Sequence, residues 1–119
     1  MKHCLVVDDS RVIREVACRI LEDLAFETAE ANDAESALLA CRTRMPDAIL
    51  LNAPQPGGVA FLKRLRRERN GSHPVVVLCT TQNNVTCIEA GIVAGANDYL
   101  MKPFDQDILH EKLAQVGLI

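Results

Sequence analysis

The sequence predicts an α/β fold in which helices cover both faces of a five-stranded parallel sheet. Five short apolar runs alternate with five longer segments whose apolar residues recur every three or four positions. The runs are apolar at almost every position, as expected of parallel strands that are buried on both faces. The 119 residues are enough for one sizeable core and too few for two, so we expect a single domain over 1–119.

Each predicted strand corresponds to one of the apolar runs. Runs such as CLVV, AILL and VVVLC lack the alternation of apolar and polar residues that marks a sheet with one wet face. The predicted strands are roughly His3–Val7, Phe26–Glu30, Ala48–Asn52, Val75–Thr80 and Tyr99–Met101.

Capping residues mark the first two predicted helices. Ser10 is the expected N-cap of the first helix. The second is expected to begin at Asn32, where Glu35 three residues later completes a capping box, and to end at Met45-Pro46. The residues expected to face the core are Val12, Ile13, Val16, Ala17, Ile20, Leu21 and Leu24 in the first helix, and Ala34, Ala37, Leu38 and Cys41 in the second.

The last three predicted helices differ in quality. The third covers about 58–69 and ends at Asn70-Gly71, a pair suited to left-handed backbone. The fourth, near 83–93, is rich in β-branched residues and holds Gly91, which costs ~1 kcal/mol relative to alanine, so we expect it to be the most mobile. The fifth covers about 105–116. The expected inward residues of the third and fifth helices are Val59, Phe61, Leu62, Leu65, Ile108, Leu109, Leu113 and Val116.

Charge and composition exclude several classes of protein. The net charge of −3 gives no general field for nucleic acid. The N-terminal stretch MKHCLVVDD is neither a signal peptide nor a membrane span, so we expect a cytoplasmic protein. Five cysteines without a C-x-x-C pair are expected to be reduced and buried, and three widely separated histidines do not suggest zinc.

Polar residues follow four of the five predicted strands. They are Asp8-Asp9, Asn52, Thr80-Thr81 and Lys102-Pro103. In open parallel sheets the ligand crevice lies beyond the carboxyl ends of the strands, so these residues are expected to form one site. Adjacent carboxylates suit Mg²⁺, and Lys102 would supply a positive charge for an anion beside it. The alternative is that Asp8 and Asp9 only form a turn and a helix cap.

Four motifs and their spacing resemble the receiver domain of bacterial response regulators. The resemblance covers about residues 3 to 117 and implies a single-domain, CheY-like regulator of flavodoxin-like fold with no attached effector. The joint spacing is specific, although each motif alone is weak. The motifs are LVVDDSR, PDAILLN with Pro56 four residues after Asn52, VVVLCTT and AGANDYLMKPF.

The resemblance implies a role for each residue at the strand ends. Asp8 and Asp9 match the family's acidic pair for Mg²⁺, and the backbone carbonyl of Pro54 matches a third ligand. Asn52 stands where the family keeps the aspartate that accepts a phosphoryl group from a histidine kinase. The remaining matches are Thr80 to the hydroxyl that turns toward the phosphoryl group, Tyr99 to the aromatic that changes rotamer with it, Lys102 to the cation that contacts it, and Pro103 to a proline after a cis peptide bond.

Asn52 is the main departure from the family's pattern. An amide oxygen is a feeble nucleophile, so Asn52 should not accept phosphate, and two carboxylates with an amide should bind Mg²⁺ more weakly than three carboxylates. Gln55 and a loop two residues shorter than the family's favour a natural pseudo-receiver over an engineered knock-out. Lys102 could then pair with Asp8 or Asp9 and hold Thr80, Tyr99 and the fourth helix in one arrangement. The rival hypothesis keeps regulation by Mg²⁺, a partner or another ligand.

The expected function is therefore two-component signalling through protein contacts. Expected partners are a histidine kinase, a phosphotransfer protein or an effector, bound through the fourth helix, fifth strand and fifth helix, with the chain a monomer or weak dimer. No nucleic acid, membrane or enzymatic activity is expected. A flavin carrier would need a Ser-, Thr- or Gly-rich first turn, and metal-dependent phosphohydrolases space their aspartates as D-x-D. The basic run KRLRRER is either a solvated face or a docking patch for an acidic partner.

Overall fold

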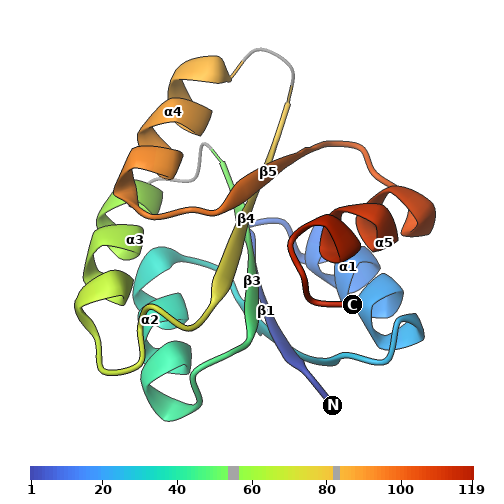
Figure 1. The fold of residues 1–119 in the computed structure, drawn as a ribbon, viewed down its shortest axis with the longest axis horizontal. Helices are drawn as coiled ribbons and strands as arrows, with labels where there is room; N and C mark the ends of the chain where they lie inside the picture. Colours follow the sequence, from blue (N-terminus) through green and yellow to red (C-terminus); the bar gives the residue numbers. More distant parts are fainter. Residues whose placement is uncertain (54–56, 82–83) are drawn as a thin grey trace.

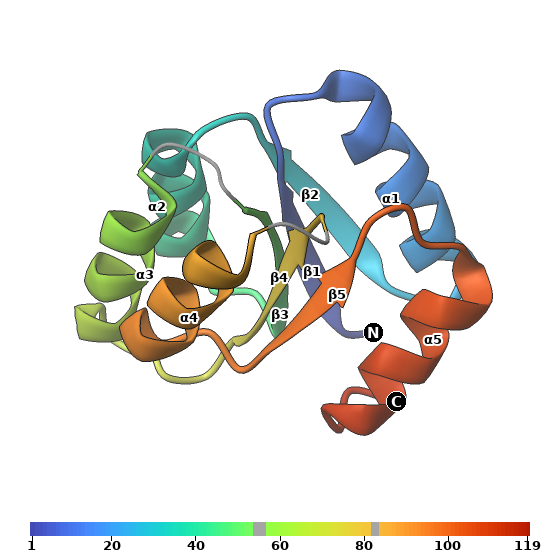
Figure 2. The same ribbon diagram turned by 90° about the horizontal axis from the view of Figure 1, so that it is seen from above.

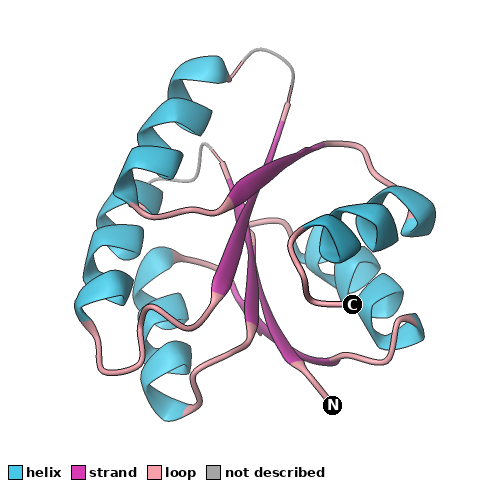
Figure 3. Ribbon diagram, in the orientation of Figure 1, coloured by secondary structure: helices cyan, strands magenta, loops and turns pink. Residues whose placement is uncertain are grey.

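The computed structural model describes residues 1–53, 57–81 and 84–119 and has the predicted α/β architecture. Five parallel strands form one sheet in the order β2-β1-β3-β4-β5, with helices packed against both of its faces (Figures 1 and 3). The strands are β1 (His3–Val7), β2 (Glu27–Ala31), β3 (Ala48–Asn52), β4 (Val75–Thr80) and β5 (Asp98–Met101).

The helices divide into two layers. In Figures 1 and 2, α1 and α5 lie on one side of the sheet and α2, α3 and α4 on the other. The helices are α1 (Arg11–Asp23), α2 (Ala34–Thr43), α3 (Gly58–Arg67), α4 (Val85–Ala94) and α5 (Gln106–Gln115). None of the helices in the described part of the chain is long and apolar enough to cross a membrane.

The sheet separates two hydrophobic cores. Successive residues of a strand point to opposite faces, so Leu5 and Val7 pack toward α2 and α3 while Cys4 and Val6 pack toward α1 and α5. All five residues of β1 are buried. This two-sided burial explains why the central strands read as continuous apolar runs.

The strand predictions are confirmed with small shifts at two strands. Three strands have the expected bounds, β2 lies one residue later than expected, and β5 begins one residue earlier. β2 is an edge strand whose pattern is partly exposed, with Glu27 and Glu30 facing solvent. Because β2 contains polar residues, its first and last residues are hard to recognise in the sequence.

The predicted cap of α1 is confirmed and that of α2 is wrong. Ser10 has extended backbone, and its hydroxyl accepts from the Ile13 N–H at 3.4 Å. The α2 N-cap is Asp33 rather than Asn32, and Ser36 rather than Glu35 closes the capping box. Asp33 accepts from the Ser36 N–H at 2.7 Å, and the Ser36 hydrogen bonds lower the pKa of the Asp33 carboxyl. Because β2 runs to Ala31, Asn32 falls in the connection.

The helices bury narrower stripes than their patterns predict. Five residues are exposed rather than inward, namely Val12, Ile13, Val16, Val59 and Ile108, and α1 buries only Ala17, Cys18 and Leu21. A helix lying on a sheet covers one stripe, and apolar residues on its flanks reach solvent. The other expected core residues of α3 (Phe61, Leu62, Leu65) and of α5 (Leu109, Leu113) are buried.

Two residues affect the helices on the α3–α4 side: Asn70 follows the end of α3, and Gly91 sets how closely α4 approaches the sheet. Asn70 has a φ of 63°, the left-handed conformation expected there, although α3 itself ends at Arg67. A Cβ on Gly91 would lie 2.4 Å from Cδ1 of Leu78, so the absence of a side chain lets α4 approach β4 closely. The greater mobility of α4 stays a prediction.

All five cysteines are free thiols, as predicted. Four of them, Cys4, Cys18, Cys41 and Cys79, are buried, and Cys87 is half-buried. Burial raises the pKa of the Cys79 thiol to about 12 and that of Cys41 to about 11. These thiols therefore stay protonated and pack as small apolar residues.

Candidate functional site

The predicted site residues come from the carboxyl ends of four adjacent strands. β1 lies between β2 and β3, so the strand order reverses beside it and a crevice is expected there. Asp8 follows β1, and Asn52 and Thr80 are the last residues of β3 and β4. Lys102 follows β5, and its backbone N–H donates to the Thr80 carbonyl at 2.6 Å.

Lys102 connects the ends of β1 and β3. Its Nζ donates to Oδ2 of Asp8 at 3.0 Å and to Oδ1 of Asn52 at 2.5 Å. The Asp8 side chain is 4 % exposed and that of Lys102 is 17 % exposed, so the ion pair is largely shielded from water. The expected pairing of Lys102 with one of the two aspartates is confirmed, with Asp8 as the partner. The Lys102–Pro103 peptide bond is cis.

Asp8 is fixed by more than the lysine. Its Oδ1 accepts from the Ser10 N–H at 2.9 Å, and its N–H donates to the Ala31 carbonyl at 3.1 Å. Nη1 of Arg14 donates to the Asp8 carbonyl at 2.7 Å, and Nε of Arg14 pairs with Glu30 at 3.0 Å. Both carboxylate oxygens of Asp8 therefore already have partners. The helical pattern predicts an outward Arg14, so this support for the β1–α1 turn was missed.

The other expected metal ligands are arranged differently. Asp9 is exposed, whereas its neighbour Asp8 is buried. Pro54, Gln55 and the loop length between β3 and α3 lie outside the described residues. Among residues 1–53, 57–81 and 84–119, no group of three or more His, Cys, Asp or Glu side chains could hold a metal ion.

The oxygen donors at this site fit Mg²⁺ only in part. Asp8, Asp9 and Asn52 offer hard oxygen atoms, and each carboxylate oxygen of Asp8 has a second lone pair beside its existing hydrogen bond. However, the set has two negative charges, and the Lys102 ammonium already lies against one of them. Asp8 and Asp9 are the side chains that would hold the ion.

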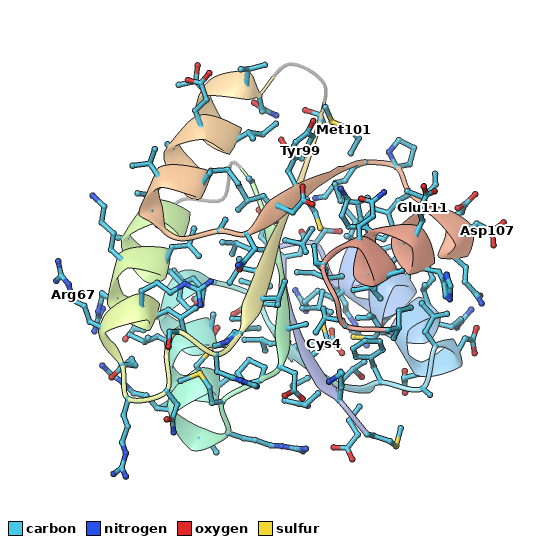
Figure 4. All side chains as sticks on the ribbon, viewed as in Figure 1. Cys4, Arg67, Tyr99, Met101, Asp107 and Glu111 are labelled. Carbon is cyan, nitrogen blue, oxygen red and sulfur yellow. The ribbon has the colours of Figure 1, made fainter. Side chains whose placement is uncertain are left out.

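The two proposed switch residues occupy different environments. Thr80 is fully buried, and its hydroxyl donates to the Thr81 carbonyl at 3.4 Å. Tyr99 is 42 % exposed on β5, where Figure 4 shows it near Met101 and away from the sheet interior. Nζ of Lys112 lies 5.7 Å from the centre of the Tyr99 ring. Lys102 thus gathers Asp8, Asn52 and the end of β4 into one site, and Tyr99 lies outside it.

A small apolar cavity that the sequence did not indicate flanks Asn52. It has a volume of about 180 Å³. Its walls come from the end of β3, from α3 at Leu62, and from α4 at Cys87 and Gly91. The space between α4 and the end of β3 therefore borders Asn52.

Comparison with known proteins identifies the family. The chain matches the response regulator receiver domain over residues 4–114. It belongs to this family. The fold agrees, because the chemotaxis response regulator CheY4 of Vibrio cholerae superimposes with a TM-score of 0.89 over 98 % of both chains, at 29 % identity.

Two further relatives show how widely receiver domains are used. The phosphate regulon transcriptional regulatory protein PhoB of Escherichia coli is 36 % identical over 117 residues, which are 97 % of this chain and 51 % of PhoB. The chain thus spans about half the length of the curated relatives it matches first. The receiver domain of the sensor histidine kinase PA1611 of Pseudomonas aeruginosa, solved with a magnesium ion in its active-site cleft, is 27 % identical with a TM-score of 0.86, covering 96 % of this chain and 95 % of that one.

Proposed function

We propose that this receiver domain is a pseudo-receiver, which signals in a two-component pathway by binding proteins and not by carrying phosphate or acting as an enzyme. The observation that supports this is the neutral Asn52 amide at the end of β3. Its oxygen accepts from Lys102, in contact with the buried Lys102–Asp8 ion pair. The position from which a receiver would attack phosphorus then holds no anion.

The chemistry of phosphoryl transfer explains the consequence. In an ordinary receiver, a carboxylate oxygen bonds to phosphorus while the bond from phosphorus to the histidine nitrogen of the donor breaks. The Asn52 amide oxygen carries no full negative charge, so it is a poor nucleophile. It also already accepts a hydrogen bond from Lys102. A bound Mg²⁺ would neutralise phosphoryl oxygens, but it would not supply the missing nucleophile.

The remaining contacts favour one fixed arrangement of the switch region. Lys102 contacts Asp8 and Asn52 through its side chain and Thr80 through its backbone N–H. We infer that these bonds hold the ends of four strands in the geometry that a partner recognises. The proposed docking face is α4–β5–α5, where the exposed side chains include Val93, Tyr99, Met101 and Ile108.

The partners proposed for this face are a histidine kinase, a phosphotransfer protein or an effector, in the cytoplasm. A pseudo-receiver that binds such a protein lowers the concentration of the free partner, and it needs no phosphate to do so. Asn52, whether natural or engineered, has the same consequence for this chemistry. The chain is proposed to act as a monomer or weak dimer.

A second candidate function is regulation by Mg²⁺ rather than by phosphate. It is favoured by Asp9, which is exposed next to the buried Asp8 and is therefore free to receive an ion from solvent. Binding would need to draw Asp8 away from Lys102. A ligand shifts a conformational equilibrium only through its different affinity for the two states.

Amide NMR spectra of α4 test the proposal. The spectra are recorded with and without Mg²⁺ and a non-hydrolysable acyl-phosphate analogue, for the native chain and for Asn52→Asp. We expect no change in α4 of the native chain and a clear response in the variant. A large response of the native α4 to the analogue would contradict the pseudo-receiver, and a response to Mg²⁺ alone would favour the second candidate.

A further inference from the structure

Positive charge is concentrated in one part of this acidic chain. Residues 42–69 contain seven of the thirteen lysines and arginines but only two of the sixteen acidic residues, although the net charge of the chain is −3. This segment runs from the end of α2 through β3 to just beyond α3. The fixed arrangement around Asn52 does not use these charges.

Three of the seven cations have structural partners. Arg42 pairs with Glu68, and Arg44 pairs with Glu27 at 2.8 Å. The guanidinium of Arg66 donates to the backbone carbonyls of Gly71, Pro74 and Gly95 at 2.7 to 3.0 Å and is partly buried. Arg66 therefore ties the end of α3 to the loops that precede β4 and β5.

The other four cations face solvent. Lys63, Arg64, Arg67 and Arg69 are exposed, and none of them takes part in an ion pair within the described ranges 1–53, 57–81 and 84–119. Figure 4 shows Arg67 projecting outward from α3. Such charges attract an anionic partner and are largely neutralised only when one binds.

Two of the exposed cations, Arg64 and Arg69, border a groove between α2 and α3 together with Arg42, and we call this groove the α2–α3 seam. One hollow of about 390 Å³ is lined by Leu39 and Arg42 of α2 and by Ala60 and Arg64 of α3. A second hollow of about 300 Å³ shares Arg42 and extends to Arg69. Three arginines therefore line the seam against two carboxylates, Glu35 and Glu68, of which Glu68 pairs with Arg42. The seam also has an apolar side chain, Leu39, that is 64 % exposed.

We propose that the α2–α3 seam binds an acidic segment of a partner protein, with an apolar side chain of that segment packed on Leu39. The charge of the seam selects carboxylates, and the exposed leucine selects a segment that also carries apolar residues. Nucleic acid fits less well, because the one aromatic side chain lining the hollow, Phe61, is buried and offers no surface for base stacking. This contact goes beyond the proposed function and does not depend on Asn52.

A short fluorescent peptide of glutamates with leucines one helical turn apart is the probe. Its affinity is measured by anisotropy in physiological salt for the full chain and two charge-reversal variants. Arg42→Glu/Arg64→Glu/Arg69→Glu changes the seam, whereas Lys2→Glu/Arg11→Glu/Arg19→Glu makes the same change of net charge elsewhere. All six residues are exposed, so both variants are expected to fold, which circular dichroism checks.

The seam variant should bind the peptide about tenfold more weakly, because each exposed ion pair contributes only part of the binding free energy. The control variant should lose less than about twofold in affinity. Leu39→Ser should weaken binding about threefold, and amide shifts should map to α2 and α3. The proposal is overturned if the peptide does not bind, if both triple variants lose affinity equally, or if a leucine-free glutamate peptide binds as well. It is also overturned if single-stranded DNA or anionic vesicles displace the peptide through the same residues.

Discussion

Two aspartates at opposite ends of the sheet show different uses of a carboxylate. Asp8, at the carboxyl end of β1, is buried and pairs with Lys102 at 3.0 Å. Asp47, at the amino end of β3, is 30 % exposed and pairs with Nε2 of His73 at 2.8 Å. Its other oxygen accepts from the His3 N–H at 2.8 Å. Both carboxylates thus link segments that are distant in the sequence.

The difference lies in solvent and in the partner. A buried charge depends on its partner, because removing one member leaves the other without compensation. Water screens the more exposed pair, so its contribution to stability is small. In addition, burial lowers the pKa of His3, which lies beside Asp47 at the amino end. The carboxyl end is therefore expected to be sensitive to substitution, and the amino end to pH.

Removal of the lysine should produce the largest effect. Lys102→Met leaves the Asp8 carboxylate buried and unpaired, so we expect the free energy of unfolding to fall by about 3 kcal/mol in urea titrations. Lys112→Met is the matched control, because Lys112 pairs with the more exposed Asp98 and should cost less than about 1 kcal/mol. Equal losses in the two variants would show that burial of Asp8 is not what matters.

Restoring a carboxylate at position 52 should alter metal binding next most strongly. Asn52→Asp places a third negative charge beside Asp8 and Asp9, so the affinity for Mg²⁺ in isothermal titration calorimetry should rise about tenfold or more. Asp47→Asn, at the other end of the sheet, should leave this affinity unchanged. A native chain that already binds Mg²⁺ as tightly as the variant would refute the weakened site.

The amino end should lose stability in acid through His3. Burial, followed by the charge of Arg44, lowers the pKa of His3 below its ordinary 6.5, so the folded state favours neutral His3. Stability should be constant above pH 6.5 and decline as pH falls from there toward the lowered pKa, because only the unfolded chain binds the proton. Urea midpoints measured from neutral to mildly acidic pH check this, and His3→Leu should remove the decline.

A separate window concerns Asp47. The hydrogen bond from His73, followed by that from the His3 N–H, lowers the pKa of the Asp47 carboxyl below 3.8. Its stabilisation is therefore complete above that value and is lost only as pH falls through the lowered pKa. The two contributions are therefore expected at different pH. If His3→Leu still lost stability only in the pH range assigned to His3, and not below pH 3.8, this assignment would be contradicted.

The smallest expected effect is at the exposed pair itself. His73→Asn removes the contact with Asp47, but the His73 side chain is 58 % exposed, so unfolding should become easier by only about 0.5 kcal/mol. The measurement is the same urea titration. A loss as large as that of Lys102→Met would remove the contrast between the two ends.

The strands and the grouping of the site followed from the sequence for physical reasons. Strands buried on both faces must be apolar throughout, and parallel topology brings the carboxyl ends of β1, β3, β4 and β5 to one edge. Asp8, Asn52 and Lys102 therefore meet although they are far apart in the chain. That these three residues lie together could be predicted without knowing any side-chain conformation.

Other features depended on details that a pattern does not contain. Neighbouring residues Asn32 and Asp33 can both cap a helix, and the end of β2 decides between them. The rotation of α1 decides that Arg14 reaches the Asp8 carbonyl while Val12 and Val16 stay exposed. Asp8 and Asp9 are chemically identical, and only the path of the turn buries one and exposes the other. Each of these outcomes depends on tertiary packing.

Incubation with acetyl phosphate and Mg²⁺, followed by intact-mass spectrometry of the native chain and of Asn52→Asp, tests the central claim most directly. The native chain should keep its mass, because the Asn52 amide cannot attack phosphorus, and the variant should gain the mass of one phosphoryl group. A phosphoryl adduct on the native chain would contradict the pseudo-receiver.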